Sequence, residues 1–161
     1  MTKLLTLAAL IALPAVAAVA QAPMAASTYV MKAGAGDQYE IQSSRLLLSS
    51  TKNAKLRSFA TMMVADHTKS TAEIKAAAMR AGLHPAPPKL DAMGTKDVAA
   101  LRAASGTARD RLYVEQQKAA HQRALMLHQT YAQTGTAVPL KTSAAAIAPV
   151  VQTHIGKLSS M

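Results

Sequence analysis

Apolar residues recur every three or four positions through most of the chain, and this spacing constrains the fold more than any other feature of the sequence. Such a period places apolar side chains along one face of an α-helix. No stretch shows the sustained alternation of β-branched and polar residues that is typical of a strand. The sequence therefore predicts an all-α fold.

The first two long helices are separated by a short break of small polar residues at 49–53. We expect the first helix to begin at Asp37, because a carboxylate suits the N-cap position. The second helix is predicted over residues 54–81, and Gly82 supplies a residue that readily ends it. These two helices form the first predicted hairpin.

The second hairpin follows a stiff connection. Residues 84–88 read His-Pro-Ala-Pro-Pro, which is typical of an extended linker, and a short helix is expected over 95–104. The next long helix is predicted over 107–135. The last helix follows Thr136, and Pro149 is expected to bend it or restart it.

Four amphipathic helices of this kind predict an antiparallel four-helix bundle of two helical hairpins. The hairpins are joined by a long crossover, from about residue 82 to residue 106, that carries the short extra helix. A crossover of this length can reach past a whole helix. The two hairpin turns can therefore lie at the same end of the bundle or at opposite ends.

Residues 1–20 have the pattern of a secretory signal peptide. Lys3 is followed by an apolar run, and small residues at Ala18 and Ala20 match the rule for cleavage after residue 20. The alternative, a membrane anchor, is disfavoured because the run is shorter than the roughly 20 residues that span a bilayer. We therefore expect export, to the periplasm or to an outer-membrane-associated location.

The mature N-terminus, residues 21–36, is rich in Ala, Gly, Ser and Pro without a period, and is predicted to be a flexible leader. Residues 37–161 then form the helical domain. No later segment is apolar enough to predict a transmembrane helix. The mature chain is therefore expected to carry no membrane span.

The sequence lacks the residues that several classes of chemistry require. The chain has no cysteine, no tryptophan and only 3% aromatic residues, which argues against disulfides, thiolate metal sites, thiol catalysis and an aromatic stacking platform. It also lacks a nucleophile elbow, a glycine-rich phosphate loop and a His-Glu-x-x-His pair. An enzymatic function is therefore disfavoured.

The formal net charge is +10, and the lysines and arginines are spread along every predicted helix. Nucleic-acid binding is disfavoured, because no groove-sized basic run exists and the chain is expected to leave the cytoplasm. A basic exported bundle is better suited to associate with anionic envelope surfaces or with protein partners. This non-enzymatic association is one of two functions that we consider.

The other function is metal binding at mid-bundle. Counting about 1.5 Å per residue from the expected turns places His67, His121 and His154 roughly 24 Å along their own helices, at one height. Asp37 falls within about two residues of that height, and Glu40 within about five. Imidazole and carboxylate groups that converge inside a bundle are suitable ligands for one Zn, Fe, Mn or Cu ion. The candidate ligands are Glu40, His67, His121 and His154, with Asp37 as the alternative carboxylate.

The alternative to a metal site is that the histidines are core residues whose ring nitrogens bond a carbonyl or a carboxylate such as Asp66 or Glu40. A standard di-iron site is excluded, because the sequence contains no Glu-x-x-His pair.

Five methionines, at positions 62, 63, 79, 93 and 126, are expected to fill the core rather than to bind copper.

Four segments of the sequence resemble one bacterial exported family, catalogued as domain of unknown function 4142. They are KLRSFATMMVADHTKS at 55–70, GDQYEIQSSRLLLSS at 36–50, RDRLYVEQQKAAHQRAL at 109–125 and APVVQTHIGKL at 148–158. Members of this family are often labelled predicted outer-membrane proteins. The resemblance implies a ferritin-like helical bundle in the periplasm or envelope, and it implies no reaction.

Overall fold

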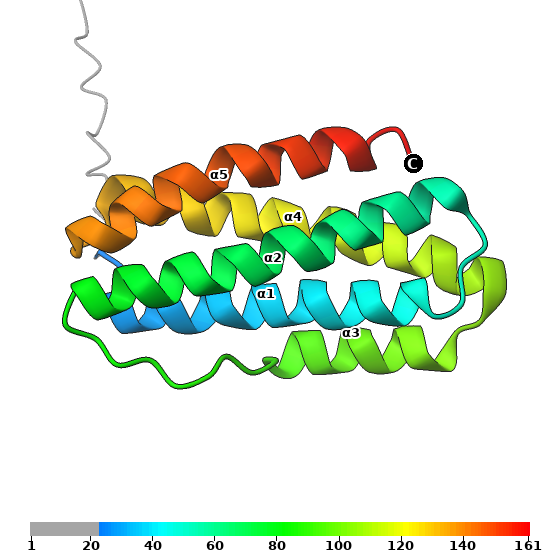
Figure 1. Cartoon of the computed structure of the whole chain (residues 1–161), viewed down its shortest axis with the longest axis horizontal. Coiled ribbons are helices and arrows are strands. Elements are labelled where there is room, and N and C mark those ends of the chain that lie inside the picture. The colour runs from blue at the N-terminus through cyan, green and yellow to red at the C-terminus, as the bar shows by residue number, and fades with distance from the viewer. Residues whose placement is uncertain (1–22) are drawn as a thin grey trace, which may run out of the picture.

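The structure is a computed structural model that describes residues 23–161. The predicted signal peptide, residues 1–20, lies outside the described residues. Within them the chain forms five helices and no strand (Figure 1). The helices are α1 (Ala26–Leu48), α2 (Ala54–Arg80), α3 (Ala92–Ala103), α4 (Gly106–Thr134) and α5 (Val138–Leu158). The predicted all-α fold, with four long helices and a short extra one, is confirmed.

The helices form a bundle in which every neighbouring long pair is antiparallel. Helix α1 packs against α2 and α4, and α2 packs against α5. The turn between α1 and α2 and the turn between α4 and α5 lie at opposite ends of the bundle (Figure 1). The crossover therefore runs the length of the bundle, and its helix α3 packs on α1 and α4. No helix among residues 23–161 is both long enough and apolar enough to cross a membrane.

Local interactions explain where the helices of the first hairpin and the crossover begin and end. The side chain of Asn53 caps α2 by accepting hydrogen bonds from the backbone N–H groups of Lys55 and Leu56. Gly82 follows α2 with a φ of 76°, which lets the chain turn away from the helix axis. Asp91 caps α3, with its carboxylate 2.7 Å from the backbone nitrogen of Gly94.

The prediction of a flexible leader over residues 21–36 is wrong from Ala26 onward, because α1 begins there. Tyr29 is fully buried, and its ring stacks on Tyr131 of α4 with ring centroids 4.0 Å apart. These tertiary contacts order a segment whose composition alone favours disorder. Asp37 is consequently in the interior of α1 and does not cap it.

The core has an apolar cluster towards each end of the bundle and a polar layer between them. One cluster surrounds the stacked tyrosines, and the other surrounds Phe59 and Tyr113. Between them along the helices lie buried polar and charged groups: Asp37, Glu40, Ser43, Ser44, His67, Gln117, His121 and His154. Helix α3 adds a small third cluster through Val98, against Tyr39 and Ala120.

One sequence prediction within the helices needs correction. Met63 is fully buried, but Met79, Met93 and Met126 are each about half exposed or more, so they do not fill the core. The reason is that a helical period alone does not show which face of a helix is covered. Of the two effects expected of Pro149, a restart does not occur, because α5 runs through this residue without ending there.

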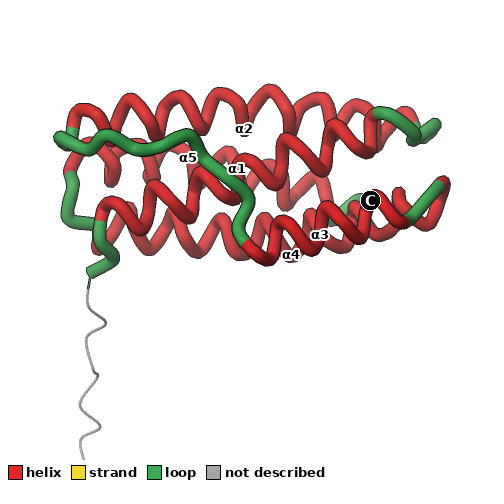
Figure 2. Tube along the Cα trace, turned by 90° about the horizontal axis from the view of Figure 1, so that it is seen from below, coloured by secondary structure: helices red, strands yellow, loops and turns green. Residues whose placement is uncertain are grey.

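The proline-rich linker lies against the outside of the first hairpin (Figure 2). Pro88 approaches Gly34 of α1 so closely that a β-carbon at position 34 would lie 2.8 Å from Cβ of Pro88. Only glycine allows this approach without displacing the linker. The contact fixes the linker against the bundle near the beginning of α3.

Candidate metal centre

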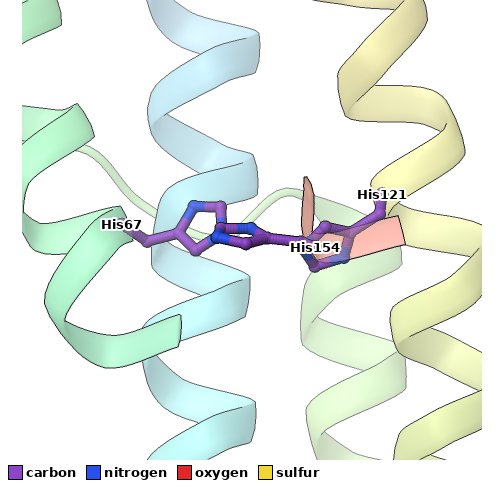
Figure 3. A group of neighbouring side chains, drawn as sticks. All are labelled: His67, His121 and His154. Atoms are coloured by element: carbon purple, nitrogen blue, oxygen red, sulfur yellow. The ribbon is translucent and has the colours of Figure 1, made fainter. Parts of the chain in front are cut away.

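Three histidine rings from three helices meet in the polar layer. His67 comes from α2, His121 from α4 and His154 from α5, and Figure 3 shows the rings directed towards one another. One nitrogen of each ring can be chosen so that all three lie within 4.8 Å of one another. The rings are 7%, 1% and 2% exposed, so solvent does not satisfy these nitrogens. The predicted convergence of the three histidines is thus present in the structure.

The other nitrogen of each ring is held by a hydrogen-bond acceptor. Nδ1 of His67 lies 2.8 Å from Oδ1 of Asp37. Nδ1 of His121 lies 2.9 Å from the backbone carbonyl of Gln117, one turn earlier in α4. Nε2 of His154 lies 2.9 Å from Oδ2 of Asp66 in α2. Carbonyls and carboxylates only accept hydrogen bonds, so each of these outer nitrogens carries the ring proton.

The inner nitrogens are then Nε2 of His67, Nε2 of His121 and Nδ1 of His154. In a neutral ring whose outer nitrogen donates, the inner nitrogen presents a lone pair. The inner nitrogens of His121 and His154 are 3.3 Å apart, so two lone pairs face each other. Nε2 of His67 is buried with no hydrogen-bond partner among the described residues. A buried nitrogen of this kind needs a partner, which is a cation when the ring is neutral and a hydrogen-bond acceptor when the ring is protonated.

The electrostatics keep two of the rings neutral. Burial lowers the pKa of His121 to about 3, and the nearby charge of His67 adds to this effect. Burial also lowers the pKa of His154, although the hydrogen bond to Asp66 opposes the shift. Burial acts in the same direction on His67, but the hydrogen bond that its ring donates to Asp37 and the charges of the surrounding carboxylates outweigh it and raise the pKa of His67.

Glu40 was predicted as the fourth ligand, and the structure does not place it with the inner nitrogens. Its Oε1 lies 3.6 Å from Nδ1 of His121, which is the outer nitrogen. Its Oε2 is buried and has no hydrogen-bond partner within residues 23–161. Burial raises the pKa of Glu40 to about 7. Glu40 therefore borders the histidine cluster without belonging to it.

A further set of contacts supports the cluster from outside. The hydroxyl of Thr71 donates to Oδ2 of Asp37 at 3.0 Å, so the carboxylate that holds His67 is itself held. Phe59 packs near the rings of His121 and His154, with centroid distances of 6.3 and 6.4 Å. Such supporting contacts fix the orientation of metal-ligating imidazoles in many proteins.

Sequence reasoning found some of these partners and missed others. Asp66 was considered as a partner of a core histidine, and it bonds His154. Asp37 was placed at the height of His67, which it contacts. The carbonyl of Gln117 and the hydroxyl of Thr71 were missed. The sequence carries no specific signal for the Gln117 contact, because every residue within a helix has a backbone carbonyl one turn earlier.

Access to the cluster is limited. The side chain of Asp66 is 37% exposed, whereas the ring of His154 that it bonds is 2% exposed. The carboxylate of Asp66 thus lies between solvent and the cluster. A carboxylate in this position attracts cations towards the three rings.

With the geometry described, the chain can be compared with known proteins. The family model described as a domain of unknown function, DUF4142, matches residues 12–161. The chain belongs to this family. The segments in which the sequence resembles DUF4142 carry Glu40, His67, His121 and His154, and therefore every predicted ligand. No match is found among curated proteins.

A solved structure shows the same fold. It is the crystal structure of the "putative secreted protein DUF305" from Streptomyces coelicolor. The TM-score is 0.70 at 12% sequence identity, and the match covers 84% of this chain and 89% of that chain. At this identity the likeness shows the fold alone.

Proposed function

We propose that this DUF4142 bundle binds a single transition-metal ion through His67, His121 and His154. The observation that carries the proposal is the 3.3 Å approach of the inner nitrogens of His121 and His154, with a third ring nitrogen within 4.8 Å. Two neutral imidazoles gain nothing from this approach unless a cation lies between them. An ion at this point gives each inner nitrogen a partner.

The distances suit tetrahedral coordination. Two nitrogens that each lie about 2.0–2.1 Å from a tetrahedral Zn²⁺ are about 3.3–3.4 Å from each other. The separation between the inner nitrogens of His121 and His154 already has this value. A small rotation of the His67 ring would complete a three-nitrogen site with one position left for water.

The donor set favours some metals over others. Imidazole nitrogen suits Zn, Cu, Fe and Ni, whereas Mn prefers carboxylate and water oxygens. Glu40 lies on the outer side of His121, so it does not supply oxygen to the ion in this arrangement. We therefore expect Zn²⁺ or Cu²⁺ to bind more tightly than Mn²⁺.

Binding of the ion, rather than a reaction at it, is the function that the surroundings favour. The three rings are almost completely buried between two apolar clusters. A substrate larger than water has little room at such a site. Holding an ion for storage, transfer or sequestration needs only a path for the ion itself.

The proposal is tested with protein that has been stripped of metal by a chelator. Zn²⁺ is titrated by calorimetry, and Co²⁺ is titrated in parallel because its visible absorption reports tetrahedral nitrogen coordination. The variants are His67→Gln, His121→Gln and His154→Gln, each measured alone. His84→Gln is the matched control, because His84 is exposed in the linker, away from the three rings.

We expect one ion per chain in the natural protein and in His84→Gln. Each of the other three variants should lose at least 100-fold in affinity or the tetrahedral Co²⁺ spectrum, or both. Loss of one imidazole ligand removes a third of the donor set. A natural chain that takes up no stoichiometric Zn²⁺, Co²⁺ or Cu²⁺ would exclude the proposal, as would equal losses in His84→Gln.

A further inference from the structure

A groove lies between the first hairpin and the proline-rich linker. Its volume is about 900 Å³, and it is lined by α1, by α2 and by the linker up to the cap of α3. Most of the lining is apolar, including Val30, Ile74, Leu83, Pro85 and Leu90. This volume is within the range of about 300–1,000 Å³ that is typical of small-molecule sites.

The wall of the groove is fixed at both ends. At one end Gly82 ends α2, and the backbone N–H of Leu83 bonds the carbonyl of Ala78 at 2.9 Å. At the other end Pro88 lies against Gly34, and Asp91 caps α3. Prolines between these points restrict the backbone further. The groove is therefore largely formed before any ligand arrives.

Three lysines surround this apolar lining, one on each wall. Lys32 is on α1, Lys75 is on α2 and Lys89 is on the linker, and all three are exposed. Within residues 23–161 none of them forms an ion pair with a carboxylate. The acidic residue of the lining, Asp91, accepts a hydrogen bond from Gly94 at the start of α3. The rim is thus positive while the interior is apolar.

We propose that this groove binds a single-chain amphiphile with an anionic head group, a long-chain fatty acid. The alkyl chain would lie along Val30, Ile74 and the prolines, and the carboxylate would be held by the lysines. Each CH₂ group that is buried adds to the affinity, so the alkyl chain supplies most of it. This proposal does not depend on the metal site.

A peptide fits the groove less well than an alkyl chain. An extended peptide needs backbone donors and acceptors along its length. Pro85, Pro87 and Pro88 have no N–H group to offer, and the N–H groups in the interiors of α1 and α2 are used within the helices. An alkyl chain has no such requirement.

The test measures palmitate binding to the full chain by calorimetry, at concentrations below those at which palmitate aggregates. Hexadecyltrimethylammonium is the matched ligand, because it has the same chain length and the opposite head-group charge. Lys32→Glu/Lys75→Glu reverses two charges at the rim. Lys52→Glu/Lys96→Glu makes the same change in net charge at two exposed positions outside the groove.

We expect saturable binding of one palmitate per chain and much weaker binding of the cationic amphiphile. The rim variant should bind palmitate roughly tenfold more weakly, and the control double variant should match the natural chain. Equal loss in both double variants would show a general charge effect and overturn the proposal. The proposal also fails if palmitate does not bind, if both head groups bind alike, or if dimerisation of the chain closes the groove against palmitate.

Discussion

The carboxylate of Asp37 in α1 holds the ring of His67 in α2, with Oδ1 2.8 Å from Nδ1. This bond fixes a ring proton on the outer nitrogen and, in the neutral ring, directs the lone pair of Nε2 into the cluster. The relationship joins the two helices of the first hairpin at the height where the second hairpin contributes His121 and His154. The proposed site therefore depends on α1 even though α1 contributes no ligand.

Asp37→Asn should weaken Zn²⁺ binding about 10- to 100-fold, which is the usual effect of removing an outer partner of a ligating histidine. The neutral amide can still accept a hydrogen bond, but it no longer stabilises the imidazole by charge. Calorimetric titration of metal-free protein measures the change. Asp97→Asn on α3 is the control, and a similar loss there would contradict a specific role of Asp37.

Glu40→Gln distinguishes the observed arrangement from the ligand set that the sequence predicted. Because Glu40 lies beside the outer nitrogen of His121, we expect the variant to bind one Zn²⁺ with an affinity within about tenfold of the natural chain. The tetrahedral Co²⁺ spectrum should be retained. A loss as large as that in His121→Gln would show instead that Glu40 moves in to coordinate the ion.

Gly34→Ala and Gly36→Ala form a matched pair on α1. The new methyl group at position 34 would meet Pro88, and we expect it to destabilise the protein by about 1–3 kcal/mol. At position 36 nothing lies within 4 Å of the new β-carbon, so the substitution should stabilise by about 0.5–1 kcal/mol. Urea unfolding compares the two. Equal effects would show that the linker does not resist displacement.

His128 makes the stability of the metal-free chain depend on pH. Burial lowers its pKa to about 4, with His67 adding to the shift and Asp37 opposing it. The folded state therefore favours the neutral ring that lies 2.9 Å from the hydroxyl of Tyr29. The resulting stability is present above pH 6.5, and about 3 kcal/mol of it is lost as the pH falls towards 4.

The unfolding free energy in urea at pH 7 and pH 4.5 measures this loss. His128→Gln should reduce the difference between the two values, because glutamine does not titrate in this range. His84→Gln should keep the full difference, since His84 is exposed. An unchanged difference in His128→Gln would assign the acid sensitivity to other buried groups, such as His121.

Helix positions followed from the apolar period, because that period reports directly which residues can share a buried face. The boundaries of α2 and α4 agree with prediction within about one residue. The start of α1 could not be predicted, because the order of residues 26–36 comes from contacts with distant residues, above all the stacking of Tyr29 on Tyr131. Nor did the length of the crossover determine at which ends the hairpin turns lie.

At the site, counting residues from the turns predicted how far along the bundle each side chain lies. It did not predict in which direction the side chain points around its helix axis. Height was sufficient to bring His67, His121 and His154 together and to place Asp37 near His67. Rotation decides which nitrogen faces inward and put Glu40 on the outer side of His121. The acceptor for His121 is a backbone carbonyl, and every residue has one, so the sequence does not mark it.

The association of this protein with anionic surfaces stays a prediction.

The opposite placement of the two hairpin turns has a mechanical consequence. No peptide segment closes the α1–α2 unit onto the α4–α5 unit at either end, and the crossover alone ties them covalently. An ion bound by His67 on one hairpin and by His121 and His154 on the other would cross-link the two hairpins midway along the bundle. Removal of the ion would weaken the packing between the two hairpins. The supply of metal would therefore control how tightly the two hairpins are held together.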